Sequence, residues 1–161
     1  MFLNMGKIKF LVMDVDGTLT DGKIYISSQG EIMKAFNVKD GYTIYTLDKF
    51  GITPIIITGR SSEIVARRAE ELRIKDLYQG VSNKLQKLNE VLKIYNGNLS
   101  EVAYIGDDYN DLDCIRACGF SACPADAESE IISEVGYVCK TKAGDGAVRE
   151  FVKKLKELSL I

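Results

Sequence analysis

Short apolar runs alternate with amphipathic segments along most of this chain of 161 residues. The runs are uninterrupted, as in strands that are buried on both faces of a sheet. They cover residues 8–13, 52–57, 77–78, 102–105, 120–123 and 137–139. Apolar residues recur at helical spacing over residues 41–50, 62–72, 84–95, 111–118 and 147–158. This alternation predicts βαβ units and a three-layer, Rossmann-like α/β fold, in which helices cover both faces of a parallel sheet.

One segment departs from this alternation. In KIYISSQGEIMKAFN, residues 23–37, apolar and polar positions partly alternate on both sides of a Ser-Ser-Gln-Gly turn. This pattern predicts a β-hairpin inserted between the first strand and the first helix. A two-stranded hairpin is marginally stable alone, and this one carries several apolar residues, so we expect it to pack against the body of the protein or another subunit. With no repeat or linker, the pattern predicts one domain over residues 1–161.

The composition bears on the class of partner. Hydrophobic residues make up 46% and charged residues 27% of the chain, as in ordinary globular proteins. The net charge of −2 offers no basic surplus for nucleic acid or an anionic membrane surface. No apolar stretch approaches the roughly 20 residues of a membrane-spanning helix. The N-terminal segment also lacks the features of a secretory signal, so we expect a cytoplasmic location.

The chain contains no histidine, and its four cysteines form no CxxC pair. A zinc site is therefore not expected, and the thiols are expected to be unpaired and mostly buried. Without imidazole, any acid-base chemistry must use Asp, Glu, Lys, Tyr or Cys.

Polar side chains gather directly after four of the predicted strands. In an open parallel sheet the carboxyl ends of the strands share one edge, and ligands bind there. The residues at these positions are Asp14 and Asp16, then Thr58 and Arg60, then Lys84, and then Asp107, Asp108 and Asp111. Helix capping or turn formation explains any one of them alone, but not the whole set.

This set of residues suits phosphoryl transfer. Carboxylate oxygens of Asp14 and Asp107 can hold a magnesium ion, and the cation offsets the repulsion between neighbouring carboxylates. Asp14 can then act as a nucleophile and form an aspartyl-phosphate. Asp16 is placed to protonate the leaving alcohol and to deprotonate the attacking water. Thr58 and Lys84 would contact the transferring phosphoryl oxygens, where charge develops in the transition state.

The stretches DVDGT, ITGR, a lone lysine and GDDYND occur in the order of the four motifs of the haloacid dehalogenase superfamily, which the chain therefore resembles. The resemblance implies a nucleophile at Asp14 and an acid/base at Asp16. It also implies magnesium held by the Asp14 side chain, the Asp16 backbone carbonyl and Asp107, with support from Asp108 and Asp111. The short intervals between the motifs leave no room for a cap domain beyond the hairpin.

Further stretches resemble one family within that superfamily. KAFNVKDGY, LYQGVSNK, VAYIGDD and GAVRE, together with DVDGTLTDG, are similar to 3-deoxy-D-manno-octulosonate 8-phosphate phosphatases over residues 8–151. The resemblance implies Mg²⁺-dependent hydrolysis of that sugar-acid phosphate, a place in lipopolysaccharide biosynthesis, and a homotetramer whose hairpins form a central β-barrel. It implies substrate binding by Asn37, Val38, Lys39, Asp40, Gly41, Arg60, Arg68 and Lys84. Guanidinium groups suit a ligand with both a carboxylate and a phosphate.

The chain departs from the family pattern at a few positions. Thr18 stands where Val is frequent, and Lys39 stands where Arg is usual. Ala143 and Asp145 replace a glycine and an arginine within AGDGAVRE. The sequence stops at Ile161, whereas some relatives carry a longer tail that reaches into a neighbouring site.

Other functions stay open at this point. A phosphatase for nine-carbon keto-sugar acid phosphates is one, although such enzymes tend to carry Glu at the position of Arg60. A broad-specificity phosphatase for small molecules is another. A receiver-type phosphoacceptor domain also gathers acidic residues, a Thr and a Lys at strand ends, but its acidic pair and its phosphoacceptor lie on different strands. A scaffold that acts through its hairpin alone would not need the four motifs.

Overall fold

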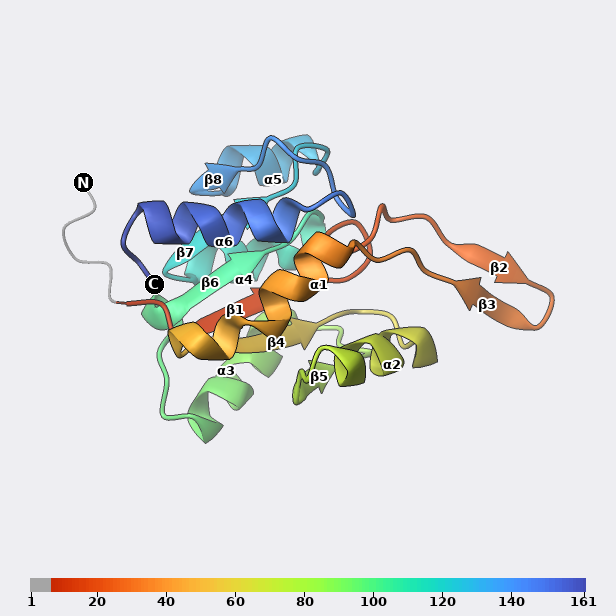
Figure 1. Ribbon diagram of the computed structural model, residues 1–161, viewed down its shortest axis with the longest axis horizontal. Coiled ribbons are helices and arrows are strands. Elements are labelled where there is room, and N and C mark those ends of the chain that lie inside the picture. The colour runs from red at the N-terminus through yellow and green to blue at the C-terminus, as the bar shows by residue number, and fades with distance from the viewer. Residues whose placement is uncertain (1–6) are drawn as a thin grey trace.

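The computed structural model describes residues 7–161, which form a three-layer α/β fold (Figure 1). All neighbouring strands of the six-stranded sheet are parallel, in the order β5-β4-β1-β6-β7-β8. The strands are β1 (Phe10–Met13), β4 (Thr53–Ile57), β5 (Asp76–Tyr78), β6 (Val102–Ile105), β7 (Phe120–Cys123) and β8 (Tyr137–Val138). The fold class expected from the sequence is confirmed.

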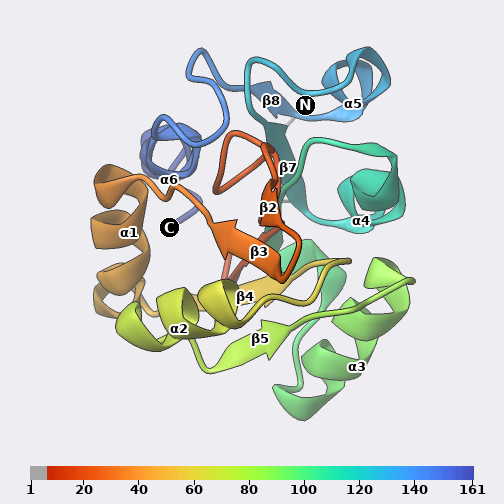
Figure 2. The ribbon, with the colours of Figure 1, turned by 90° about the vertical axis from the view of Figure 1, so that its right-hand side faces the viewer.

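Helices cover both faces of this sheet (Figure 2). One face carries α1 (Val38–Tyr45), α2 (Glu63–Glu71) and α6 (Ala147–Glu157). The other face carries α3 (Lys84–Ile94), α4 (Leu112–Ala117) and α5 (Ser129–Glu134). Short 3₁₀ segments are η1 (Leu47–Phe50), η2 (Leu99–Glu101) and η3 (Tyr109–Asp111).

The sequence of β1 explains why both faces need a cover. Successive side chains of a strand point to opposite faces of a sheet. Leu11 and Met13 accordingly pack on the side of α1 and α6, and Phe10 and Val12 pack on the side of α3 and α4. All four are buried, which is the pattern of a central strand in a parallel sheet. Three of the four cysteines are also buried, and all four are free, as expected from the sequence.

The helix predicted over residues 41–50 begins and ends at other residues in the structure. Here α1 begins earlier, at Val38, because the side chain of Asn37 accepts hydrogen bonds from the backbone N–H groups of Lys39 and Asp40. The helix also stops a turn earlier than expected, and η1 covers the last of the predicted residues. The other predicted helices and strands lie within two residues of their expected ends.

The sequence pattern did not predict α5. This helix has six residues, and only Ile131 among them is buried. A single apolar contact over less than two turns leaves no helical periodicity to recognise.

The predicted hairpin consists of β2 (Tyr25–Ser27) and β3 (Gly30–Met33), an antiparallel pair outside the main sheet. It projects away from the sheet and its helices (Figure 1). The exposed fraction is 67% for Ile26 and 58% for Ile32, whereas Phe36 packs against the core beyond the second strand. The hairpin strands therefore keep these apolar side chains off the body of the chain.

The helices of this fold are short. The longest, α3 and α6, have 11 residues each, about half of the roughly 20 that cross a bilayer. Within residues 7–161, no helix is both long enough and apolar enough to span a membrane.

We expect Ile55→Ala to lower the free energy of unfolding by about 2–5 kcal/mol, because it empties a fully buried position in β4 between the sheet and α3. The matched control is Ile94→Ala on α3, where the isoleucine is 73% exposed and the change should stay within about 0.5 kcal/mol. Denaturant unfolding measures both. Equal losses in the two variants would contradict the assignment of this core.

Candidate active site

The carboxyl of Asp14 stands directly beyond the end of β1. Its backbone N–H donates to the carbonyl of Ile105 at 3.1 Å, which continues the pairing of β1 with β6. The residue is 5% exposed, and Nζ of Lys84 lies 2.9 Å from its Oδ1. The sheet therefore determines where this carboxylate lies, and a buried ammonium balances part of its charge.

Lys84 is the first residue of α3, and its side chain is 1% exposed. Asn83 caps the helix by accepting a hydrogen bond from the backbone N–H of Gln86. The ammonium lies 2.9 Å from Oδ1 of Asp14 and 2.7 Å from Oδ1 of Asp111. Burial acts to lower the pKa of Lys84, but the two carboxylates outweigh it and raise that pKa above its ordinary value. The lysine therefore stays charged beside the strand ends.

Asp111 is a fully buried carboxylate that connects three parts of the site. Besides the ammonium of Lys84, it accepts hydrogen bonds from the Tyr104 hydroxyl at 2.6 Å and from the backbone N–H groups of Asp107 and Asp108 at 2.9 and 3.3 Å. It thus shapes the loop after β6 and positions the lysine. The sequence had assigned this residue only a supporting role.

The loop after β1 packs directly on Asp107. The hydroxyl of Thr18 donates to Oδ1 of Asp107 at 2.8 Å. Gly17 has a φ of +86°, and a Cβ at that position would lie only 2.0 Å from Oδ2 of Asp107. Glycine is therefore required at this turn, for its backbone conformation and for the approach of the carboxylate. The Thr18 hydroxyl thus helps to hold Asp107 in place.

Three carboxylates converge at this edge of the sheet. Oxygen atoms of Asp14, Asp107 and Asp111 lie within 4.8 Å of one another. Burial, with the charge of Asp14, raises the pKa of Asp107 to about 8. Burial, with the charge of Asp111, raises the pKa of Asp14 to about 6, although Lys84 opposes the shift. Asp108 lies outside this group: it is exposed, and its side chain accepts a hydrogen bond from the backbone N–H of Tyr109.

A pocket of about 140 Å³ opens beside Asp14. Its lining contains five of the residues that the sequence selected, together with a glycine and an asparagine. They are Asp14, Asp16, Thr58, Gly59, Arg60, Asp108 and Asn110. The ends of β1, β4 and β6 contribute these residues, so the parallel topology does bring the predicted strand-end groups together. Asn110 had no role in the sequence analysis.

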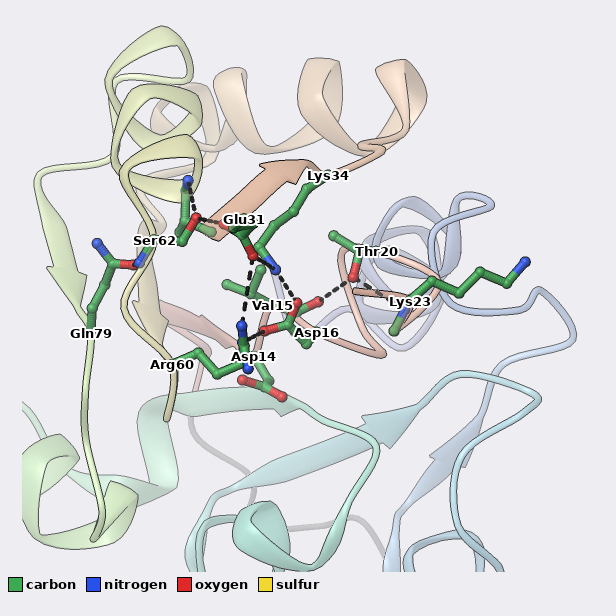
Figure 3. Close-up of polar contacts among 12 residues, drawn as sticks. Asp14, Val15, Asp16, Thr20, Lys23, Glu31, Lys34, Arg60, Ser62 and Gln79 are labelled. Atoms are coloured by element: carbon green, nitrogen blue, oxygen red, sulfur yellow. Dashed lines mark hydrogen bonds and ion pairs between the residues drawn. The ribbon is translucent and has the colours of Figure 1, made fainter. Parts of the chain in front are cut away.

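A second polar group reaches Asp16 from the hairpin side (Figure 3). Nζ of Lys34 lies 2.5 Å from Oδ1 of Asp16, and Nε of Arg60 lies 3.7 Å from Oδ2. The same Lys34 ammonium lies 2.9 Å from Oε1 of Glu31, whose Oε2 accepts a hydrogen bond from the Ser62 hydroxyl. Sequence reasoning missed Lys34 and Glu31. Their only signal was an acid and a base three residues apart in a largely apolar hairpin.

Part of the predicted substrate segment, residues 37–41, lines a different cavity. Its residues form the cap and the first turn of α1, where Asp40 is buried and accepts a hydrogen bond from the backbone N–H of Arg149 at 2.8 Å. Val38 is 77% exposed, on the outside of this turn. With Arg68, part of the segment lines a cavity of about 10 Å³ among apolar side chains. Substrate binding by this segment stays a prediction.

We expect Asp111→Asn to lower the free energy of unfolding by about 3 kcal/mol, near the low end for a broken buried ion pair because Asp14 still pairs with Lys84. An amide at this position also turns an N–H donor toward the donors that the carboxylate now satisfies. Denaturant unfolding of this variant is compared with that of Asp108→Asn, a change at an exposed carboxylate. A loss below about 1 kcal/mol would contradict the organising role of Asp111.

Comparisons with known proteins agree with this geometry. The family described as haloacid dehalogenase-like hydrolase matches residues 74–151. The 3-deoxy-D-manno-octulosonate 8-phosphate phosphatases of Yersinia pestis and Escherichia coli K12 are 45% and 43% identical over 143 residues, which span 89% of this chain and 76% of each relative. The crystal structure of the Moraxella catarrhalis phosphatase of that name, in complex with magnesium ion, phosphate ion and KDO molecule, superposes with a TM-score of 0.91. It is 41% identical, and the match covers 96% of this chain and 90% of that one. The chain therefore belongs to the 3-deoxy-D-manno-octulosonate 8-phosphate phosphatase family of the haloacid dehalogenase-like hydrolases.

Proposed function

We propose that this protein is a magnesium-dependent phosphatase that hydrolyses 3-deoxy-D-manno-octulosonate 8-phosphate to the free sugar acid and phosphate. The observation that carries the proposal is the carboxylate of Asp14, buried at the end of β1, paired with Lys84, and open to a pocket that also holds Asp16 and Thr58. The names of the similar phosphatases and the KDO bound in one of their structures support the choice of substrate. The place in lipopolysaccharide biosynthesis implied by the resemblance goes with this substrate.

The donor set fits a magnesium ion. Oxygen atoms of three carboxylates lie within 4.8 Å of one another, and Asp14 and Asp107 both have pKa values raised by burial and by their acidic neighbours. A hard divalent cation with oxygen ligands relieves that repulsion. Asp14 and Asp107 would hold it, with the backbone carbonyl of Asp16. Asp111, through its four hydrogen bonds, positions Lys84 and the loop that carries Asp107. When bound, the ion shields the phosphate charge from the attacking carboxylate.

Different residues of the chain carry out the successive steps of the proposed reaction. A carboxylate oxygen of Asp14 attacks phosphorus, the bond from phosphorus to the sugar oxygen breaks, and Asp16 gives its proton to that oxygen. Water then attacks the phosphorus of the aspartyl-phosphate and loses its proton to Asp16, while the bond from phosphorus to the Asp14 oxygen breaks and releases phosphate. The buried hydroxyl of Thr58 and the ammonium of Lys84 contact the phosphoryl oxygens, where charge accumulates. Arg60, half-exposed at the pocket, faces the carboxylate of the sugar acid.

We also propose that the hairpin mediates the homotetramer implied by the resemblance. Its strands expose Ile26, Ile32 and Met33, at 67%, 58% and 49%. A two-stranded hairpin needs a partner to bury such side chains, and further copies of the same hairpin would supply one. The cytoplasmic location and the single domain over residues 1–161 also stay predictions.

We expect purified protein with Mg²⁺ to have a kcat/KM for the eight-carbon sugar-acid phosphate at least about 100-fold above those for a nine-carbon homologue and for simple phosphate monoesters, because Arg60 and the pocket contact the sugar acid. Phosphate release over this panel measures it. Asp14→Asn, which keeps the shape but removes the nucleophile, should abolish release from every substrate. A flat profile with an inactive Asp14→Asn would leave a phosphatase of broad specificity and contradict the substrate.

The raised carboxyl pKa values predict how Mg²⁺ binding depends on pH. Folding raises the pKa of Asp14 from 3.8 to about 6 and that of Asp107 from 3.8 to about 8, so the folded chain without metal binds more protons than the unfolded chain. The stability that these groups contribute is complete below about pH 4 and is lost as pH rises through about 8. Mg²⁺ competes with the same protons.

We therefore expect the rise in Tm caused by Mg²⁺ to be small near pH 6 and to grow up to about pH 8, as Asp107 loses its proton. Thermal unfolding with Mg²⁺ or with a chelator measures this rise. The control is Asp107→Asn, in which the rise should disappear at every pH. A Mg²⁺-induced rise in Tm that is the same at both ends of this range would contradict the proposed ligands.

A further inference from the structure

The side chain of Lys34, in the segment that follows β3, is 1% exposed although it belongs to the hairpin arm. Its ammonium lies between two carboxylates, 2.5 Å from Oδ1 of Asp16 and 2.9 Å from Oε1 of Glu31 (Figure 3). Buried lysine side chains are rare, and they are normally paired with groups of opposite charge. Here one of those charges belongs to the acid/base of the proposed reaction.

The other end of this contact is anchored in the body of the protein. Oε2 of Glu31 accepts a hydrogen bond from the hydroxyl of Ser62. Ser62 caps α2, because its side chain accepts from the backbone N–H of Val65 at 3.3 Å, and its own N–H donates to Oε1 of Gln79 at 2.8 Å. The contact therefore runs from the start of α2 through Glu31 and Lys34 to Asp16, and two elements of the main fold keep it in place.

Asp16 has little else to orient its carboxyl. It lies in the loop after β1, and its side chain is 19% exposed. Among the described residues, the other charged contact is Nε of Arg60, 3.7 Å from Oδ2, and that arginine side chain is 51% exposed. Lys34 holds Oδ1 at hydrogen-bond distance, and this contact orients a carboxyl that lines the pocket.

The charge of Lys34 is secure in this environment. Burial acts to lower the pKa of Lys34, but the carboxylates of Asp16 and Glu31 outweigh that effect and raise the pKa above its ordinary value. Its position between two carboxylates suits this ammonium for holding a carboxylate in place.

We propose that Lys34 is a positioning residue: it does not reach the substrate, but it holds the carboxyl of Asp16 where that group meets the oxygen of the leaving alcohol. The proposal rests on the proposed function, in which Asp16 is the acid/base. A general acid must lie within hydrogen-bond reach of the oxygen that it protonates. A displacement of about 1 Å can cost a factor of about 100 in rate.

The test compares two substrates of similar size that need the acid to different degrees. Benzyl phosphate releases an alkoxide, which must be protonated, whereas p-nitrophenyl phosphate releases a phenolate, which leaves without a proton. We expect Lys34→Met to lower kcat/KM for benzyl phosphate by about 10- to 100-fold and that for p-nitrophenyl phosphate by less than about threefold. The ratio of the two kcat/KM values reports only the steps up to the aspartyl-phosphate, so the later attack of water does not enter it.

Two further variants calibrate this ratio. Lys23→Met is the matched control, because the Lys23 side chain lies on the same arm, is 72% exposed and, among residues 7–161, forms an ion pair with Asp21 alone; its ratio should equal that of the wild type. Asp16→Asn removes the acid itself and should change the ratio at least as much as Lys34→Met. If Asp16→Asn changes both substrates equally, the acid role in the proposed function is wrong. If the wild type hydrolyses neither substrate nor the sugar-acid phosphate, the phosphatase assignment itself fails.

Other outcomes separate positioning from plain structural support. A loss that is equal for both substrates in Lys34→Met, with Asp16→Asn selective, would overturn the proposal. So would a raised KM for the sugar-acid phosphate at unchanged kcat, since that pattern belongs to a residue that binds substrate directly.

Variants that keep the ammonium or its charge cover the case in which Lys34→Met does not fold, as judged by thermal unfolding. Glu31→Gln leaves Lys34 paired with Asp16 but weakens its anchor, and should lower the benzyl-to-nitrophenyl ratio by about three- to tenfold. Lys34→Arg keeps the cation and should restore most of the wild-type ratio. The proposal would also be overturned if Glu31→Gln left the benzyl-to-nitrophenyl ratio unchanged while Lys34→Arg lowered that ratio as far as Lys34→Met or Asp16→Asn does.

Discussion

The buried contact of Lys84 with Asp14 and Asp111 is the interaction on which the rest of the site depends. Two carboxylates and an ammonium, all nearly or fully buried, lie where β1, β6 and α3 meet. Each charge alone would be costly to bury, and the removal of one partner from such a group typically costs about 3–5 kcal/mol. The contact requires β1 to lie next to β6, with the start of α3 above them, and the order of the sheet provides that arrangement. The third carboxyl, Asp107, is what makes the site suitable for a divalent cation, which would take the place of its proton.

The hairpin arm carries two sets of side chains with different chemistry. Its strands expose apolar side chains away from the body, as a surface for further copies of the chain would. Glu31, in β3, and Lys34, just after β3, reach back to the site, where Lys34 contacts Asp16. Because the same short hairpin carries both sets of side chains, assembly through its strands would also restrain Glu31 and Lys34.

Much of the fold followed from local pattern. Four consecutive apolar residues in β1 can only be buried on both faces, and this alone indicated a central parallel strand with helices on either side. Where local pattern was weak, the prediction was wrong or incomplete. The start of α1 depended on the cap at Asn37, which lies outside the apolar periodicity, and α5 has too few buried positions to show any. Asp14, Asp16, Thr58 and Arg60 were found because parallel strands end at one edge, so sequence positions just after strands translate into a shared location.

The sequence by itself determined the fold class, the order of the motifs and the residue types that meet at the strand ends, because periodicity and spacing are local properties. Only the tertiary structure decided which side chains touch. It made Asp111, rather than Asp108, the third member of the carboxylate group, and it brought Lys34 to Asp16 across a hairpin. It also placed Asn37, Asp40 and Gly41 beside a different cavity from that of Asp14. These outcomes depend on the path of the loops and on the balance of buried charge, in which every neighbour in space contributes, whatever its distance along the chain.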